Sequence, residues 1–531
     1  MKSNQIYIFD TTLRDGQQSP GAGMSFNDNL QYAELADLLH IDVLEAGFPS
    51  ASDTDYWIVN SIAHNMAEKN SPMIIAALCQ LREEQVTKTM EALAPSHKIH
   101  RARVHIYVPV DPVLMKASLG GLADNKNKIV EYAYRLIKLA ASSGFDIEFS
   151  PEGYSRMHEN FSFTTDLICA AVSAGVHVIN CPDTIGGSAA AEGENYFVRH
   201  MNRHAEIIQH QFPGRDIIWS THCHNDFGLA LNNSMNAVFD GPARQIEGCI
   251  NGVGERAGNV ALEQCIMYIK QFGPCIDKDN PKFTNIHCEH LKKISDFIDE
   301  RMLPRQPHTP IVGENATRHS SGGHTNAILK NPLAYQPFNP AIIGSKITLV
   351  FGPLSGSNHA KKIIESQGYR CSNEEKADIA QAIKNYYADR RKGITDGQLM
   401  KAYFDCRAPI KSSEMSYSKT SDGKTILALQ GKFFEKKFLE IESQGASSAL
   451  AALGLAVERY LPGLAFVDYC SKAVHERSID ASCYSKIVVQ TEKGEQFIGE
   501  ATDKDIQISA LKAYIDAINK AYVAKHYRQE V

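Results

Sequence analysis

The sequence predicts an α/β protein that begins with a closed (β/α)8 barrel and continues into a helical linker region and a C-terminal α+β domain. Eight short apolar or β-branched runs alternate with amphipathic stretches in the first part of the chain, which is the rhythm that such a barrel requires. A doubly wound open sheet is the alternative, but it usually has fewer strands and a glycine-rich phosphate turn after the first one. The segment Thr11–Gly16, which follows the first run, contains no such turn. The barrel is therefore the favoured interpretation.

The predicted strands and helices follow one another in a fixed order. The strands are Ile6–Asp10, Ile41–Gly47, Met73–Cys79, Arg103–Val108, Asp146–Ser150, Val178–Pro182, Ile217–His222 and Gln245–Ile250. Among the helices, Asn27–Leu39 is introduced by Ser25 and Asp28 in capping-box spacing. Lys126–Ala141 places its apolar residues on one side, as a helix that packs on a sheet must.

The rest of the chain predicts two further regions, so that the expected domains are 1–310 (barrel), 311–411 (linker subdomains) and 412–531 (C-terminal domain). Glu374–Tyr403 is charged and has apolar residues at helical spacing, which indicates a small helical subdomain. After about Ser412 strands alternate with helices, as in Ile487–Gln490 and Ile506–Tyr522. Gly445–Ala456 is small and apolar, but its shortness and flanking charges favour a core helix over a membrane or dimerisation helix.

Composition excludes several classes of protein. The chain has 531 residues, of which 43% are hydrophobic and 22% charged, and its formal net charge is -6. This balance is typical of a globular protein and gives no basic field for nucleic acid. The polar start leads directly into a strand, without a signal core, and no apolar stretch is long enough for a membrane span. We expect a cytoplasmic protein whose twelve cysteines are free thiols.

Polar residues gather after the predicted strands, where the loops of a (β/α)8 barrel carry its chemistry. They are Asp10, Arg14, Asp15, Glu45, His105, Glu148, Ser150, Glu152, Asp183, Thr184, His222, His224, Asn225, Asp226, Asn251, Glu255, Arg256 and Asn259. Any one of them could be a helix cap or a satisfied core residue, but closure of a barrel brings all of them to one rim. So much charge in one place needs a ligand or a metal. For Asp10 and Glu148, pocket and scaffold remain equally good interpretations.

Two of these residues have the spacing of metal ligands. His222 and His224 are two positions apart, so that on a strand both imidazoles face the same side, and Cys223 between them faces the other. Asp15 and Asn259 follow the first and eighth strands, which are neighbours in a closed barrel. Two imidazoles, a carboxylate and an amide oxygen suit a divalent ion such as Mn, Mg or Zn with open positions. The sequence therefore predicts a catalytic metal at this rim.

The same segments carry a family resemblance. Phe9–Gln18, Thr221–Asp226 and Gly248–Asn259 resemble the three signatures of the Claisen-type synthases and lyases that share this barrel. Glu45–Ser50 and Asn180–Gly186 are similar to alpha-isopropylmalate synthases in particular. The resemblance implies an acyltransferase that condenses acetyl-CoA with 3-methyl-2-oxobutanoate and water, giving 2-isopropylmalate and CoA in the first committed step of leucine biosynthesis.

The resemblance also implies roles for individual residues. The metal would be bound by Asp15, His222, His224 and Asn259 and would act as a Lewis acid on the ketone of the 2-oxo acid. Arg14 would hold the developing alkoxide, and Glu152 is counted with it among the catalytic residues. The oxo-acid pocket would be formed by Gln18, His105, Ser150 and Thr184, alongside Glu152. For Ser150 and Thr184, a strand-end cap is the competing interpretation.

The segments beyond the barrel share the resemblance. His319–Asn326 is similar to a linker motif that reaches over the barrel of the partner subunit, and its histidine, here His324, would be the general base that deprotonates acetyl-CoA. The family usually has Gln-Asp after this histidine, where this chain has Thr325 and Asn326. The C-terminal domain resembles a regulatory domain, which implies a homodimer or tetramer with leucine as effector.

Alternative functions remain open from the sequence. A sibling enzyme would use pyruvate, 2-oxobutanoate or 2-oxoglutarate, and give citramalate, ethylmalate or homocitrate, because one methylene in an apolar pocket changes selectivity by only about 1–3 kcal/mol. An unrelated metal hydrolase usually has its H-x-H motif on the first strand of this fold. A purely regulatory binding protein would have no need of the full metal set, and the short lyases of the family lack the C-terminal extension.

Overall fold

A computed structural model describes residues 4–189, 193, 196–389, 393–421, 424–443, 447–474 and 482–529 of the chain. The described residues form two compact units. The first comprises the chain up to Thr317 together with Gln336–Ile347, and the second comprises Arg318–Tyr335 and Thr348 onwards. Each unit has its own hydrophobic core.

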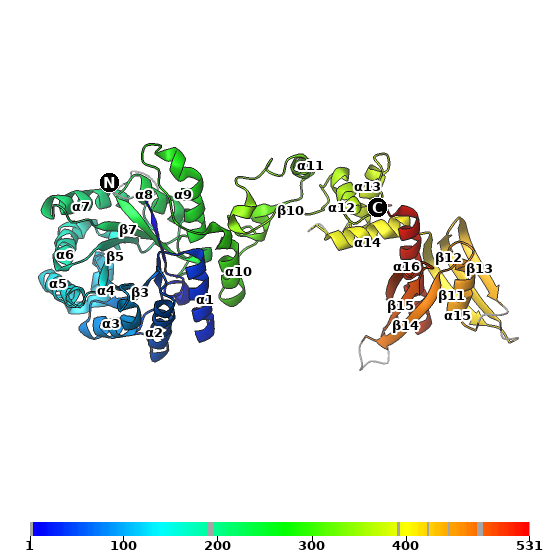
Figure 1. Cartoon of the computed structure of the whole chain (residues 1–531), viewed down its shortest axis with the longest axis horizontal. Coiled ribbons are helices and arrows are strands. Elements are labelled where there is room, and N and C mark those ends of the chain that lie inside the picture. The colour runs from blue at the N-terminus through cyan, green and yellow to red at the C-terminus, as the bar shows by residue number, and fades with distance from the viewer. Residues whose placement is uncertain are drawn as a thin grey trace. The chain divides into compact units, whose positions relative to one another are not determined.

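The first unit is built on a closed barrel of eight parallel strands in sequence order, which confirms the predicted fold (Figure 1). The strands are β1 (Tyr7–Asp10), β2 (Val43–Glu45), β3 (Ile74–Gln80), β4 (Ala102–Pro109), β5 (Asp146–Glu152), β6 (Val178–Asp183), β7 (Ile218–Cys223) and β8 (Ala243–Gly248). The barrel closes where β1 pairs with β8, with Phe9 opposite Glu247. This closure brings the loops after the first and eighth strands together.

Helices surround the barrel, and each strand leads into at least one of them. They are α1 (Phe26–Leu39), α2 (Asp53–Glu68), α3 (Glu83–His97), α4 (Pro112–Leu119), α5 (Lys126–Ser142), α6 (Phe161–Ala174), α7 (Phe197–Gln211), α8 (Ala230–Phe239), α9 (Leu262–Ile276) and α10 (Leu291–Arg301). The predicted capping box is present, since Ser25 accepts from the amide of Asp28 and Asp28 accepts from that of Ser25. The apolar side of α5 is buried as expected.

The eighth strand begins and ends two residues earlier than predicted. It stops at Gly248, where a Cβ would lie only 2.6 Å from the carbonyl oxygen of Val260. The chain therefore turns back on itself immediately after the strand, and Cys249 pairs with Ala261 in a short bridge. This close return places Asn259 next to the barrel rim.

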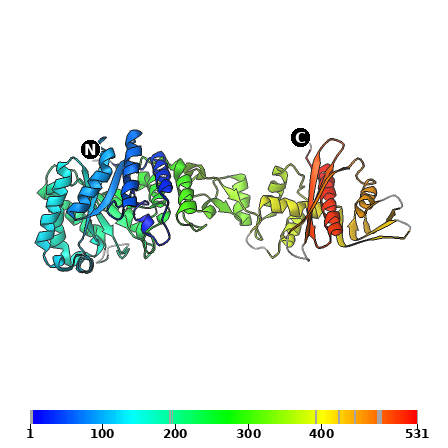
Figure 2. The ribbon, with the colours of Figure 1, turned by 90° about the horizontal axis from the view of Figure 1, so that it is seen from below.

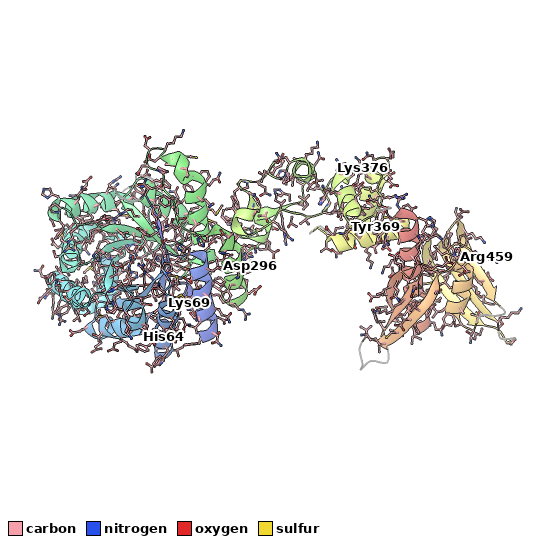
Figure 3. The ribbon with its side chains drawn as sticks, viewed as in Figure 1. His64, Lys69, Asp296, Tyr369, Lys376 and Arg459 are labelled. Atoms are coloured by element: carbon pink, nitrogen blue, oxygen red, sulfur yellow. The ribbon has the colours of Figure 1, made fainter. Side chains whose placement is uncertain are left out.

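Charges are distributed differently on the outside and the inside of the barrel. On the outer helices His64 pairs with Glu68 at 3.1 Å and Lys69 pairs with Glu34, and all four side chains are exposed (Figure 3). Such pairs are screened by water and contribute little to stability. Inside the barrel, however, Glu45, Glu148 and Glu247 are buried, with at most 1% of their surface exposed. Buried carboxylates are costly unless they are paired, so this cluster marks the functional part of the unit.

The second unit begins with short elements, continues through three helices and ends in two three-stranded antiparallel sheets. Its elements are β9 (Arg318–His319), α11 (Gly322–Lys330), β10 (Thr348–Leu349), α12 (Ser357–Ser366), α13 (Lys376–Tyr386), α14 (Asp396–Arg407), β11 (Ile410–Lys419), β12 (Thr425–Phe433), β13 (Lys436–Ser443), α15 (Ala449–Val457), β14 (Ala465–Ala473), β15 (Cys483–Gln490), β16 (Gln496–Asp503) and α16 (Ile506–Tyr527). Figure 2 shows α16, in red, against the last sheet.

The predicted helices of the second unit are present with adjusted ends. Ile379 and Ile383 on α13 are buried in the core of the helical region, as their spacing indicates. The small apolar helix starts at Ala449 and is only nine residues long, while residues 445 and 446 of the predicted segment lie outside the described residues. In the part of the chain that the structure describes, no helix is long and apolar enough to cross a bilayer.

Candidate active site at the carboxyl ends of the barrel strands

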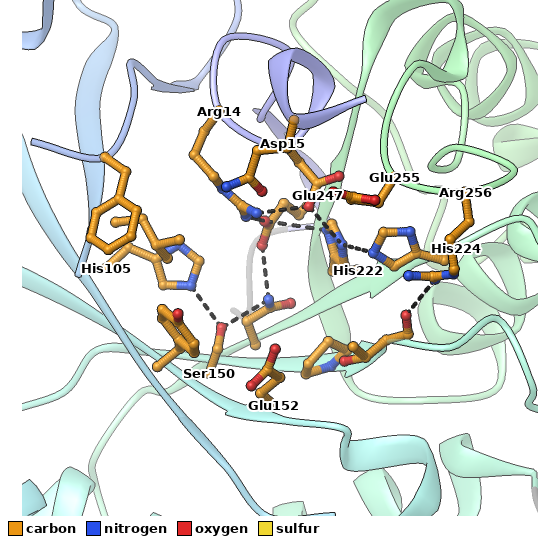
Figure 4. Close-up of a pocket in the computed structure, with 17 residues that line it drawn as sticks. Arg14, Asp15, His105, Ser150, Glu152, His222, His224, Glu247, Glu255 and Arg256 are labelled. Atoms are coloured by element: carbon orange, nitrogen blue, oxygen red, sulfur yellow. Dashed lines mark hydrogen bonds and ion pairs between the residues drawn. The ribbon is translucent and has the colours of Figure 1, made fainter. Parts of the chain in front are cut away.

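A cavity of about 200 Å³ opens at the carboxyl ends of the barrel strands (Figure 4). Its lining residues come from or follow all eight strands. They are Arg14, Asp15, Gln18, Phe48, Leu78, His105, Tyr107, Ser150, Glu152, Asn180, Pro182, Thr184, His222, His224, Glu247, Glu255 and Arg256. Nine of the eleven residues predicted for the site are in this lining; Asn259 and His324 are not.

The two histidines of β7 and its loop converge with Asp15. Nε2 of His222 lies 3.2 Å from Nε2 of His224 and 3.9 Å from Oδ2 of Asp15. Metal–nitrogen bonds of about 2.0–2.1 Å at tetrahedral or octahedral angles place two imidazole nitrogens roughly 3.0–3.4 Å apart. The separation of these two nitrogens thus fits a shared ion. Without an ion, the two nitrogens could share only one proton.

Asn259 is not among the lining residues of the cavity, but it contacts Asp15 directly. Its Nδ2 donates to Oδ1 of Asp15 at 2.6 Å and to the carbonyl of Val253 at 3.1 Å, so that its Oδ1 is left buried without a hydrogen-bond donor. A buried acceptor without a partner is costly unless a cation or water satisfies it. Gly254 keeps this corner open, because a Cβ there would lie 2.2 Å from Nδ2 of Asn259 and 3.0 Å from Asp15. These four residues therefore fit a divalent cation.

Two titratable residues of this group, His224 and Asp15, have shifted pKa values. Burial, reinforced by the neighbouring His222, lowers the pKa of His224 to about 3, so its ring is neutral at pH 7. Burial opposes ionisation of Asp15, but Arg14 and the two histidines overcome it and lower its pKa below the usual range. A neutral imidazole and an ionised carboxylate are the forms in which these side chains bind metals.

Arg14 connects the metal group to the buried carboxylates. Its guanidinium donates to Asp15 at 2.7 Å, to Glu45 at 2.6 Å and to Glu247 at 3.1 Å. Burial works against its charge, but these three carboxylates raise its pKa, and it remains a cation. The fixed fork of Arg suits this role, which the single ammonium of Lys could not fill.

The predicted oxo-acid residues form two groups along the wall. His105 donates from Nδ1 to Glu45 at 2.7 Å, and its Nε2 lies 2.7 Å from the hydroxyl of Ser150. Thr184 accepts from the amide of Gly153 at 2.9 Å, which supports the interpretation of its hydroxyl as a cap that also lines the cavity. Gln18 is exposed at the mouth.

Three further carboxylates, those of Glu152, Asp10 and Glu148, have different surroundings. Glu152 lines the cavity, and burial raises its pKa although Arg14 acts in the opposite direction. Asp10 accepts from the hydroxyl of Tyr32 at 2.6 Å, and Glu148 accepts from Arg103 at 3.0 Å; neither lines the cavity. The sequence left open whether Asp10 and Glu148 belong to the pocket or to the scaffold, and these contacts assign both to the scaffold.

His324 lies in the second unit, near the start of α11. Its half-buried ring stacks on Tyr335 with the ring centroids 3.9 Å apart, and the ring of His319 is 5.7 Å away. Thr325, where the family pattern has Gln, is buried and donates from its hydroxyl to the carbonyl of Gly322. The departure from the motif therefore still gives a regular first helical turn.

Sequence reasoning assigned no role to several lining residues, most notably Glu247, Asn180, Tyr107 and Leu78. A signal for the first was present, since Gln245 and Glu247 are two polar residues at alternate positions of the predicted strand Gln245–Ile250 and must share one face of it. Asn180 begins the segment Asn180–Gly186, which carries the family resemblance, but the resemblance implied no role for Asn180 itself. Tyr107 and Leu78 read as ordinary core residues of buried strands.

Models of three protein families match successive parts of the chain. The model described as HMGL-like matches residues 5–298, which is more than half of the chain. The one described as homocitrate synthase post-HMGL domain-like matches residues 311–392. The LeuA allosteric (dimerisation) domain matches residues 400–522.

Curated relatives match over nearly their whole length. A 2-isopropylmalate synthase of Pelotomaculum thermopropionicum is 31% identical, with 98% of each chain covered. That of Aquifex aeolicus is 32% identical, with 99% of this chain and 98% of the relative covered. That of Methylococcus capsulatus is 31% identical, with 97% of each covered.

Proposed function

This chain belongs to the family of 2-isopropylmalate synthases, and we propose the roles that its individual residues have in the reaction of that family. The enzyme condenses acetyl-CoA with 3-methyl-2-oxobutanoate and water, and releases 2-isopropylmalate and CoA in the first committed step of leucine biosynthesis. The observation that carries the proposal is the convergence of two imidazole nitrogens and Asp15 in one cavity. Asn259, which donates to Asp15, adds a buried oxygen without a hydrogen-bond partner.

Asp15, His222, His224 and Asn259 are the residues that hold the divalent cation, for which Mn²⁺, Mg²⁺ and Zn²⁺ are all suitable. When bound, the cation supplies Lewis acidity to the ketone oxygen of the oxo acid. Two nitrogens and two oxygens are a mixed donor set that would suit such a cation. The chain orients that substrate through the cavity walls on either side.

Arg14 and Glu152 are the polar groups assigned to the chemistry itself. The guanidinium of Arg14 remains charged among three carboxylates and donates to the alkoxide that develops when the new carbon–carbon bond forms. Burial raises the pKa of Glu152, so the protonated form of its carboxyl group is favoured more than it would be in water. We assign to it the proton transfers that accompany hydrolysis of the thioester by water.

The apolar part of the cavity suits a branched aliphatic substituent. Phe48, Leu78, Tyr107 and Pro182 contribute the apolar surface, whereas Gln18, His105, Ser150 and Thr184 supply the polar contacts to the oxo acid. A second carboxylate on the substrate would be costly wherever it met these apolar side chains without a partner. This asymmetry supports 3-methyl-2-oxobutanoate over 2-oxoglutarate.

A panel of oxo acids tests the substrate assignment. We expect the highest kcat/KM for 3-methyl-2-oxobutanoate, and a decrease of about 10- to 200-fold for pyruvate or 2-oxobutanoate, which fill the apolar wall less completely. The free thiol of the released CoA gives a continuous assay with acetyl-CoA at saturation. A higher kcat/KM for pyruvate or 2-oxoglutarate would contradict the assignment and indicate a citramalate or homocitrate synthase.

Each of the three regions of the chain is assigned a role: the barrel and the linker in catalysis, and the C-terminal domain in regulation of the activity. Residues 1–310 form the catalytic barrel, 311–411 the linker subdomains that carry the general base His324, and 412–531 a domain for dimerisation and regulation by leucine. The similarity of residues 400–522 to the LeuA domain supports the last assignment. The edge strand β14 supports self-association, because Phe466, Val467 and Tyr469 on it are more than 40% exposed.

The C-terminal helix is not independent of the linker helices. Val523 on α16 is buried in the same core as Ile379 on α13, and the amide of Arg370 donates to the carbonyl of Tyr527 at 2.7 Å. Removing the residues after Lys411 would open this core. A truncated chain would therefore lose activity together with inhibition, so the test of regulation needs the full chain.

Leucine at millimolar concentration should inhibit the full-length enzyme. Preferential binding to one conformation of the dimer gives a coupling of about 1–3 kcal/mol, which corresponds to a 5- to 150-fold change in apparent affinity or activity. Calorimetry measures leucine binding, and the CoA-release assay measures inhibition. Alanine at the same concentration is the matched control, since it lacks the branched side chain. Absence of both heat and inhibition would reduce the domain to dimerisation or to sensing another ligand.

A further inference from the structure

One carboxylate, that of Glu247 on β8, contacts three separate parts of the cavity. Its Oε1 lies 3.2 Å from Nδ1 of His222 and accepts from Arg14 at 3.1 Å, while its Oε2 accepts from Nδ2 of Asn180 at 2.8 Å (Figure 4). The side chain is 1% exposed. Strand pairing fixes its position, because Glu247 is in register with Phe9 on one side and His222 on the other.

The contact of Glu247 with His222 affects which of the two ring nitrogens of His222 carries the proton. Nδ1 of His222 has no hydrogen bond of good geometry, but the carboxylate of Glu247 lies 3.2 Å from it and favours the proton on this nitrogen over Nε2. Nε2 is the ring nitrogen that lies 3.2 Å from Nε2 of His224 and 3.9 Å from Asp15. Ligating histidines usually have such a partner, which fixes the tautomer and the ring orientation. Nδ1 of both histidines is without a hydrogen bond, and among the described residues only that of His222 has a carboxylate within ion-pair distance. Glu247 therefore holds one of the two imidazoles.

The other two contacts orient groups on the substrate side. Arg14 is held between Glu45 and Glu247, so its fork cannot rotate away from Asp15. Because a carboxylate only accepts, Glu247 also selects the orientation of Asn180 in which Nδ2 faces Oε2 and Ser150. The amide oxygen of Asn180 is then buried at the cavity without a protein donor.

The geometry points to Glu247 as a positioning residue that sets the metal ligand His222, the guanidinium of Arg14 and the amide of Asn180 at the same time. This inference rests on the proposed function and deepens it, since neither the metal motif nor the resemblance assigns Glu247 a role. A purely structural carboxylate would support the barrel without affecting metal affinity. Glu247 instead couples metal affinity to substrate placement.

Titration of the full-length protein with MnCl₂ in a calorimeter tests this inference without relying on turnover. We expect Glu247→Gln to weaken Mn²⁺ binding by about 10- to 100-fold, the usual effect of losing such a partner. With Mn²⁺ at saturation, the variant should also show a raised KM for the oxo acid, because the amide of Asn180 is no longer constrained. Glu247→Asp, which keeps the charge, should bind Mn²⁺ with an affinity between those of Gln and Glu.

Glu148→Gln is the matched control. Glu148 is a buried carboxylate of β5 that contacts Arg103 and Gln245 but neither His222 nor the cavity. This variant should lose thermal stability, measured by circular dichroism, while it keeps the Mn²⁺ affinity of the wild type. Wild-type affinity in folded Glu247→Gln or, if that variant does not fold, in Glu247→Asp would overturn the inference. Absence of Mn²⁺ binding by the wild type would instead contradict the metal site of the proposed function.

Discussion

Replacing His222 or His224 by Ala should remove bound metal and turnover together. Each substitution deletes one of the two ring nitrogens that lie 3.2 Å apart, and the remaining ligands cannot close the coordination sphere. Polarisation of the ketone by the metal supplies several kcal/mol, and about 4 kcal/mol corresponds to roughly a thousandfold in rate. We therefore expect kcat/KM to fall by about a thousandfold or more. Elemental analysis after dialysis gives the metal content, and the CoA-release assay gives the rate.

His204→Ala is the matched control for these two variants. His204 on α7 is also a buried histidine of the barrel, where it contacts the hydroxyl of Tyr154 at 2.7 Å, but it does not line the cavity. Its removal should lower the melting temperature and leave the metal content unchanged. If the metal-stripped wild type keeps full activity in the presence of chelator, the metal has no catalytic role.

Replacing His324 by Ala should lower kcat by about a hundredfold to ten-thousandfold, the range of a general base in proton abstraction. Deprotonation of the acetyl methyl group needs a base placed beside it, and the ring of His324 is held in a defined orientation by its stack on Tyr335. The residues proposed for the oxo acid and the metal all belong to the first unit, so calorimetry should give nearly unchanged affinities for both.

His319→Ala distinguishes the base from its surroundings. His319 belongs to the same segment, and its ring lies 5.7 Å from that of His324, so its loss disturbs the segment to a similar degree. We expect a much smaller change in kcat for this control. Equal losses in both variants, or normal turnover of His324→Ala, would assign the segment a structural role.

Much of the fold could be predicted from local patterns. The alternation of apolar runs and amphipathic helices predicted the barrel, because the spacing of apolar residues along a strand or helix shows which side chains share one face of it. The same argument placed His222 and His224 together, since residues two apart on a strand point the same way. The capping box of α1 likewise depends on residues three apart in the chain.

Other features of the site depend on elements that are distant in sequence. The sequence left Asp10 and Glu148 undecided, and only their bonds to Tyr32 and Arg103 assign them to the scaffold. It gave no role to Glu247, whose three partners come from three other strands or their loops. Such contacts are set by strand order and register around the closed barrel, which no local spacing encodes.

The sequence by itself thus determined the barrel, the family and most of the polar residues at its rim. Tertiary structure decided which of those residues belong to the proposed metal site, which line the cavity and which support the scaffold. It also buried the side-chain oxygen of Asn259 without a hydrogen-bond donor. The physical reason is that side-chain direction along one strand follows from covalent geometry, whereas the partner of a buried charge depends on which strand the closing of the barrel places beside it.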